Sequence, residues 1–119
     1  MSKHPRGDVT VTINGEDYVL EPKFKAIAAA EQATGKGLIE MMGAVASLQV
    51  GVVATVLFHA LRANEFTGLS YDDVGEAVME SIGQEDQPLV KAAIEYVNAF
   101  FPKKQAGGKK PTKAKIVTG

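Results

Sequence analysis

Few positions in this sequence carry side chains of the types that act in catalysis, and their spacing gives no catalytic arrangement. The two histidines are His4, near the amino terminus, and His59, within an apolar stretch. A catalytic base needs partners held in fixed positions, whereas Thr55 and Arg62 only form a narrow polar stripe with His59 at helical spacing. We therefore expect His59 to be solvated or locally hydrogen-bonded, and we expect no enzymatic activity.

A glycine-flanked lysine is the one segment that suggests phosphate binding. Gly35-Lys36-Gly37 lacks the longer glycine spacing of phosphate-binding loops, and no parallel strand precedes it. The segment is better interpreted as a glycine-rich junction between two helices.

An acidic cluster is the only candidate for binding a cation. Its members are Asp72, Asp73, Glu76 and Glu80. They lack the loop order that wraps calcium, and acidic side chains are favourable at the start of a helix, so a solvated acidic helix face is the preferred interpretation. The chain has no cysteine, which excludes disulfides and thiolate zinc sites. We expect neither a metal nor another cofactor.

The first elements that organise the chain are two strands. Apolar side chains alternate with threonines over residues 9–13, which is the period of a strand with one buried face. Asn14-Gly15 then gives a strong hairpin-turn signal, and residues 18–20 continue the alternation on a return strand. Because two strands alone are marginal, this hairpin should pack against helices or extend a neighbour's sheet.

About five helices follow in the predicted order. The first covers residues 23–34, with Pro22 able to begin it and Gly35 suited to its C-terminal cap. A short second helix carries apolar positions over residues 38–45, and a third, central helix has its apolar face at residues 53–61.

Capping residues set the limits of the later helices. Ser47 is the candidate cap of the third helix. Ser70 and Asp73 resemble a capping box, so the fourth helix should begin at Tyr71, and Gly83 ends it. The last helix should run from Pro88 to about Phe101, where Pro102 stops it.

These elements predict an α+β fold, with an N-terminal β-hairpin followed by a mainly helical bundle of about five helices. The 119 residues, of which 45% are hydrophobic and 23% charged, suffice for one compact domain and not for two. We place this domain at residues 8–102, after a flexible N-terminus at residues 1–7. The apolar run at residues 48–61 is too short to span a membrane as one helix.

The net charge of −1 conceals a division into an acidic body and a basic tail. Residues 103–119 contain six lysines and no acidic residue, so residues 1–102 keep 7 basic residues against 14 acidic ones and carry about −7. With three glycines, a proline and few large apolar residues, this tail should be disordered in isolation. The lysines could contact nucleic-acid phosphates, but the tail has no arginine and no aromatic residue for base readout or stacking. Balancing the charge of the acidic body, its own or a neighbour's, is at least as good an interpretation, so we do not expect nucleic-acid binding.

Five large side chains are the candidate contacts with another protein. They are Met41, Met42, Tyr96, Phe100 and Phe101. The choice rests on the area that partly exposed methionine and aromatic side chains bury on association. The last predicted helix also has more apolar surface than one packing partner usually covers. A plain core role is the favoured alternative for this surface, because large exposed apolar patches are rare.

The order of these features resembles one phage family across residues 4–102. The segments that carry the resemblance are His4-Pro5-Arg6-Gly7-Asp8-Val9, Tyr18-Val19-Leu20-Glu21-Pro22, residues 24–38, the helix at residues 53–62, and Phe100-Phe101-Pro102. The chain is similar to the tail assembly chaperones, a family that includes a small gene transfer agent protein sometimes labelled a tail tube protein.

The resemblance implies a chaperone in the cytoplasm of a bacterial host. Such a protein keeps the long, helical tape measure protein soluble while tail tube subunits polymerise around it, and it is absent from the mature virion. The implied partners are the tape measure protein, the tail tube protein and further copies of the chain, with no membrane. The alternative is a structural tube or connector subunit that stays in the virion.

Overall fold

The computed structural model describes residues 7–101, which contain two strands followed by five helices. The strands are β1 (Val9–Ile13) and β2 (Glu16–Leu20), and the helices are α1 (Phe24–Thr34), α2 (Leu38–Ala46), α3 (Val50–Ala63), α4 (Tyr71–Ile82) and α5 (Pro88–Asn98). The predicted α+β class, a hairpin followed by five helices, is confirmed. The predictions for residues 1–6 and for the basic tail at residues 103–119 lie outside the described residues.

The hairpin forms as its sequence pattern predicts. β1 and β2 pair antiparallel, with Val9 opposite Leu20 and Ile13 opposite Glu16. Asn14 and Gly15 both have positive φ angles, 54° and 83°, which a tight two-residue hairpin turn requires. Alternate residues of β1 are buried beneath the helices, so the sheet has one packed face.

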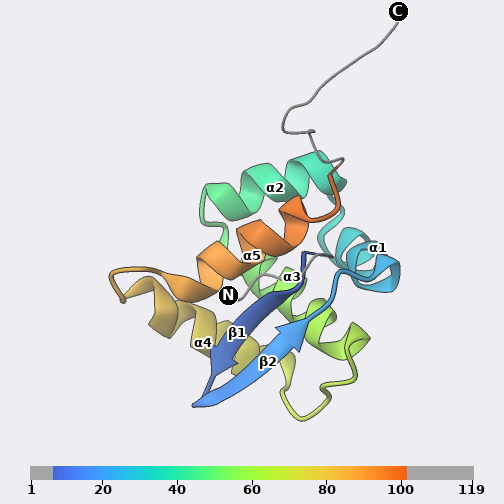
Figure 1. The fold of residues 1–119 in the computed structure, drawn as a ribbon. Coiled ribbons are helices and arrows are strands. Elements are labelled where there is room, and N and C mark those ends of the chain that lie inside the picture. The colour runs from blue at the N-terminus through green and yellow to red at the C-terminus, as the bar shows by residue number, and fades with distance from the viewer. Residues whose placement is uncertain (1–6, 102–119) are drawn as a thin grey trace, which may run out of the picture.

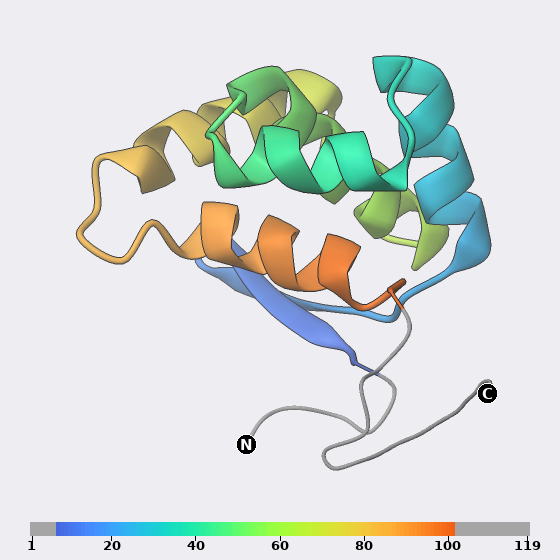
Figure 2. The ribbon, with the colours of Figure 1, turned by 90° about the horizontal axis from the view of Figure 1, so that it is seen from above.

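Helix α3 is the centre of the helical layer and contacts the other four helices. Nine of its fourteen residues are buried, which explains why its sequence is apolar on nearly every side. Helix α5 lies between the hairpin and the other helices, packing against β1 on one side and α2 on the other (Figures 1 and 2). One core therefore joins the sheet to all five helices.

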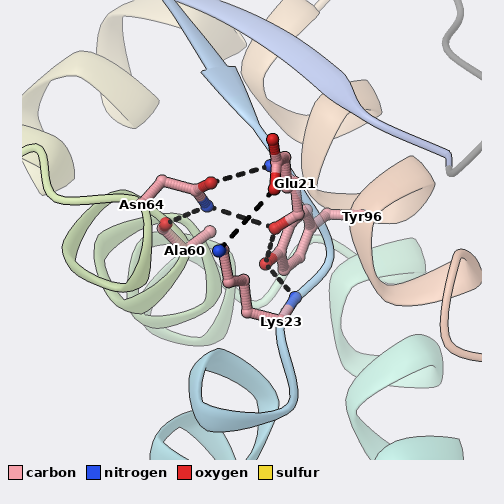
Figure 3. Close-up of polar contacts among 5 residues, drawn as sticks. All are labelled: Glu21, Lys23, Ala60, Asn64 and Tyr96. Atoms are coloured by element: carbon pink, nitrogen blue, oxygen red, sulfur yellow. Dashed lines mark hydrogen bonds and ion pairs between the residues drawn. The ribbon is translucent and has the colours of Figure 1, made fainter.

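The chain between β2 and α1 is fixed by side chains from two distant helices (Figure 3). The Tyr96 hydroxyl of α5 donates to the Glu21 carbonyl oxygen at 2.8 Å and accepts from the Lys23 amide at 3.2 Å. Asn64, which ends α3, accepts from the Glu21 amide and donates to the Glu21 and Ala60 carbonyl oxygens. These bonds satisfy the backbone where the chain leaves the sheet.

Two helix boundaries and one surface assignment differ from the sequence predictions. Ser47 ends α2, where its hydroxyl donates to the Gly43 carbonyl at 2.7 Å, and it does not cap α3. Helix α5 ends at Asn98, three residues before Phe101, where a following proline disfavours the helical conformation in any case. Thr55 is buried and bonded to a backbone carbonyl, so it is not part of an exposed polar stripe.

The first helix also begins later than Pro22 would allow. Lys23 is extended, with φ −126° and ψ 134°, and α1 starts at Phe24. The bond from the Lys23 amide to the Tyr96 hydroxyl holds this residue outside the helix.

Among residues 7–101, no single helix is long and apolar enough to cross a membrane. Helices α2 and α3 meet the criterion of length and composition only when taken together, and they are bent by 120° at their junction.

Candidate protein-binding surface

The five residues predicted to contact a partner gather where α2 packs against α5, but they are not equally accessible. Met41 and Tyr96 are 0% exposed, so the premise that they are partly exposed is wrong for these two. Met42, Phe100 and Phe101 are half-buried against the core. The Phe100 ring meets the Tyr96 ring edge-on, with centroids 5.4 Å apart. Partner binding through the three half-buried side chains stays a prediction.

The large apolar side chains that are exposed lie elsewhere. They are Val19, Phe24, Ile39, Tyr71 and Met79. Tyr71 and Met79 belong to α4, where Gly75 lies between them at a spacing of four residues. Residues four apart on a helix share one face, so the sequence did contain the signal for this stripe.

The α4 stripe forms one wall of a groove against α3. We call this feature the α3–α4 groove; its volume is about 250 Å³. The residues that line it are Val50, Gly51, Ala54, Tyr71, Asp72, Gly75, Glu76 and Met79. Both helices contribute apolar side chains to this lining, and Asp72 and Glu76 of α4 contribute carboxylates. The groove therefore offers apolar surface with negative charge beside it.

Two glycines keep the groove open. Gly51 of α3 and Gly75 of α4 both line it and have no side chains to fill it. A Cβ atom placed on either residue would meet no heavy atom within 4 Å. Packing within the described chain therefore does not require glycine at either position. Each glycine nevertheless weakens its helix relative to alanine, by about 1 kcal/mol.

Hydrogen bonds fix the rim of the groove at the start of α4. The predicted capping box is confirmed: the Ser70 hydroxyl accepts from the Asp73 amide at 3.0 Å, and the Ser70 amide donates to the Asp73 carboxylate at 2.9 Å. The Tyr71 hydroxyl lies 3.3 Å from the Gly51 carbonyl oxygen and 3.2 Å from the Thr55 hydroxyl. Tyr71 thus links α4 to α3 at one end of the groove and holds their separation.

His59 of α3 has an aromatic and cationic environment, and its ring meets the Phe58 ring edge-on, with centroids 5.2 Å apart. Partial burial lowers the pKa of His59 below its ordinary value, and the positive charge of Arg62 lowers it further. The Arg62 guanidinium lies 4.9 Å from the centre of the Phe58 ring. Both effects favour the neutral imidazole near neutral pH. His4 lies outside the described residues.

The two other candidate ligand-binding segments are the glycine-flanked lysine, which joins two helices, and the acidic cluster of α4. Gly35, with φ 72°, caps the end of α1, and Gly37 precedes α2, so the interpretation as a helix junction is confirmed. The acidic side chains of α4 are exposed. Among residues 7–101, no three His, Asp or Glu side chains come together in a way that could hold a metal ion.

Comparison with known proteins gives one informative result. No curated protein and no solved structure matches the chain. A family model described as "Phage tail tube protein, GTA-gp10" matches residues 6–96. The matched region contains the hairpin, helices α1 to α4 and most of α5, and it leaves out the lysine-rich end. The chain therefore belongs to this family of phage tail proteins.

Proposed function

We propose that this protein is a tail assembly chaperone whose α3–α4 groove binds an amphipathic helix of the tape measure protein. The observation that carries the proposal is the groove itself, whose lining combines apolar side chains with two exposed carboxylates. A client that is long and helical presents apolar faces that must be shielded before assembly, and helix-in-groove contact is a common way to do this.

The dimensions of the groove suit a short helical segment. Helix α4 has 12 residues and is therefore about 18 Å long, which matches roughly three turns of a client helix laid along it. Asp72 and Glu76 would pair with basic side chains that flank the apolar stripe of that helix. Such charges select the orientation of the client more than they add affinity.

The small size of the groove supports a reversible contact. Stable protein interfaces bury roughly 1,200–2,000 Å², whereas one groove between two short helices covers much less. A chaperone must release its client when the tube subunits arrive, so modest affinity suits the role. Under this proposal the protein acts in the cytoplasm of the bacterial host and is absent from the mature virion.

The test is co-expression with the neighbouring tape measure gene, scored by the fraction of tape measure protein that stays soluble. Complete burial of a methionine is worth roughly 1.5–3 kcal/mol. Because Met79 is 59% exposed, burying it beneath a bound client helix contributes about 1–2 kcal/mol to binding, or roughly 5- to 30-fold in affinity. Met79→Glu removes this contribution and adds a third negative charge to the groove.

Ile39→Glu is the matched control, because Ile39 is also an exposed apolar residue, 77% exposed on α2, and lies outside the groove. We expect Met79→Glu to lower the soluble fraction of the client and Ile39→Glu to leave it near the wild-type level. If both variants protect the client as well as wild type does, the groove is not the binding site. If the wild-type chain gives no protection, the chaperone function itself is wrong.

The family description favours a second candidate, a tube or connector subunit that remains in the particle. A repeating subunit needs complementary surfaces on several sides to close a ring and stack it. Mass spectrometry of purified particles separates the two functions. A stoichiometric amount of this chain in the particle would establish the structural role and contradict the chaperone proposal.

A further inference from the structure

We propose that the lysine-rich C-terminal segment of this chain, residues 109–117, binds its own folded body in an acidic trough along the free edge of β1. This goes beyond the chaperone proposal and does not depend on it. Three observations carry it: an unpaired strand edge, a run of acidic hollows beside that edge, and the position at which the described chain ends.

The first observation is the strand edge. In the described part of the chain the sheet has two strands, so β1 is paired with β2 on one side only. Helices α4 and α5 lie on the side of β1 away from β2 (Figure 1). Alternate residues of such a strand direct both backbone N–H and C=O groups away from the partner strand. An edge of this kind is a template for another extended segment.

The second observation is a row of three neighbouring hollows along this edge, which together make up the trough. A cavity of about 380 Å³ is lined by six consecutive residues, Thr10 to Gly15. Successive side chains of a strand point to opposite faces, so what these residues share toward the cavity is their backbone edge. Hollows of about 230 Å³ and about 430 Å³ adjoin it. The smaller one shares Thr10 with the first cavity, near the start of β1, and the larger one shares Asn14 with it, just after the end of β1.

The walls of this trough are mainly acidic. Carboxylates from α4, α5 and the loop between them line the three hollows: Asp73, Glu76, Glu80, Asp86 and Glu95. Lys91 is the one basic side chain among the lining residues. A polar, negatively charged trough with the backbone edge of a strand along one wall fits an extended basic peptide better than an apolar helix.

The third observation is where the described chain ends. A Cβ atom placed on Gly7 would lie 3.3 Å from the Cβ of Ala99, so the end of α5 adjoins the chain that enters β1. The C-terminal segment therefore starts at one end of the trough. Residues 102–108 span at most about 24 Å when extended, which is enough to bring residue 109 beside β1. A segment that enters here runs parallel to β1.

The sequence of the segment matches the trough. Residues 103–119 carry six lysines and no acidic residue. In an extended conformation Lys113 and Lys115 share one face, and Ala114 and Ile116 share the other. The lysine face would meet the carboxylates of α4 while backbone groups pair with β1. Surface ion pairs alone are weak, so the strand edge supplies the geometry and the charges supply selectivity.

The experiment uses the full-length chain, which contains no cysteine and so accepts a single label. Ala114→Cys carrying a nitroxide is studied by nuclear magnetic resonance. We expect the label at least to halve the amide intensities of Thr10, Thr12 and Glu80, and to leave those of α1 unchanged. Raising the salt from about 20 mM to about 500 mM should restore much of the lost intensity, because it screens exposed charges.

Two matched variants test the acidic wall. Glu80→Lys reverses a charge in the trough and outside the α3–α4 groove, and Glu31→Lys reverses an exposed charge on α1. Only Glu80→Lys should restore the intensities at β1, and the unchanged spectrum of α1 would show that the variant is folded. Equal effects of the two variants, or broadening spread evenly over the surface, would overturn the proposal.

A mixed sample decides which chain provides the segment. Spin-labelled chains without isotope are combined with isotope-labelled chains that carry no nitroxide. Binding within one chain leaves the observed amides at full intensity. Loss of intensity at β1 in this sample would mean that the segment binds a second copy, and the proposal for its own body would be wrong.

Discussion

Removing the Tyr96 hydroxyl tests whether the link between β2 and α1 is fixed by side chains from distant helices. Tyr96→Phe keeps the ring and its contact with Phe100. It removes the bond to the Glu21 carbonyl and the acceptor for the Lys23 amide. Glu21 still accepts from Asn64, so the main cost is the part-buried Lys23 amide. We expect a loss of about 1–2 kcal/mol in the free energy of unfolding.

Tyr96→Phe should also change how the free energy of unfolding depends on pH, because it removes a group that ionises at alkaline pH. Burial raises the pKa of Tyr96 to about 12, while the Lys23 amide opposes the rise and Asp8 and Glu21 add to it. The unfolded chain releases the phenolic proton near pH 10, so the folded state binds more protons between pH 10 and about 12. The stabilisation that this group contributes is complete below pH 10 and is lost across that interval, by at most about 3 kcal/mol.

Urea unfolding followed by circular dichroism at pH 7, 10 and 11.5 measures both effects. Wild type should lose stability steeply above pH 10, and Tyr96→Phe should lose less. If Tyr96→Phe is as stable as wild type at pH 7 and has the same alkaline slope, the hydroxyl does not hold the connection and our reasoning is refuted.

Three other substitutions examine the connection and the groove. Asn64→Ala removes three part-buried hydrogen bonds at the end of α3. It should therefore lower the free energy of unfolding more than Tyr96→Phe does, by roughly 2–3 kcal/mol in urea unfolding. A loss equal to or smaller than that of Tyr96→Phe would contradict this order. Gly43→Ala and Gly75→Ala should each stabilise the chain by up to about 1 kcal/mol, because a Cβ at either site meets open space. Only Gly75→Ala narrows the groove and should weaken client binding, and equal binding by the two variants would count against a client in the groove.

Local signals predicted the elements that depend on neighbouring residues. Asn14 and Gly15 adopt the positive φ angles that their types suggest, and Ser70 and Asp73 bond each other across the first turn of α4. These features close within a few residues, so the sequence alone determines them. Ser47 was ambiguous because a serine hydroxyl can satisfy groups at either end of a helix, and here it bonds backward to α2.

The features that join distant parts of the chain could not be predicted. The hydrogen bonds between Asn64 and Glu21 join residues 43 positions apart, and no local sequence pattern near either residue predicts them. Met41 and Tyr96 were expected to be partly exposed, but how α2 and α5 pack determines that both are fully buried. One wall of the groove could be predicted, because the spacing of Tyr71, Gly75 and Met79 places them on one helix face. The other wall depends on how α3 packs against α4, which the sequence does not indicate.

The most direct measurement is photo-crosslinking from the groove during assembly. Benzoylphenylalanine replaces Met79 in the groove or, as a control, Ile39 on α2, and the products from assembling cells are identified by mass spectrometry. We expect a crosslink from position 79 to an amphipathic helical segment of the tape measure protein, and little from position 39. Crosslinks from position 79 only to tube subunits or to other copies of this chain would contradict the chaperone function.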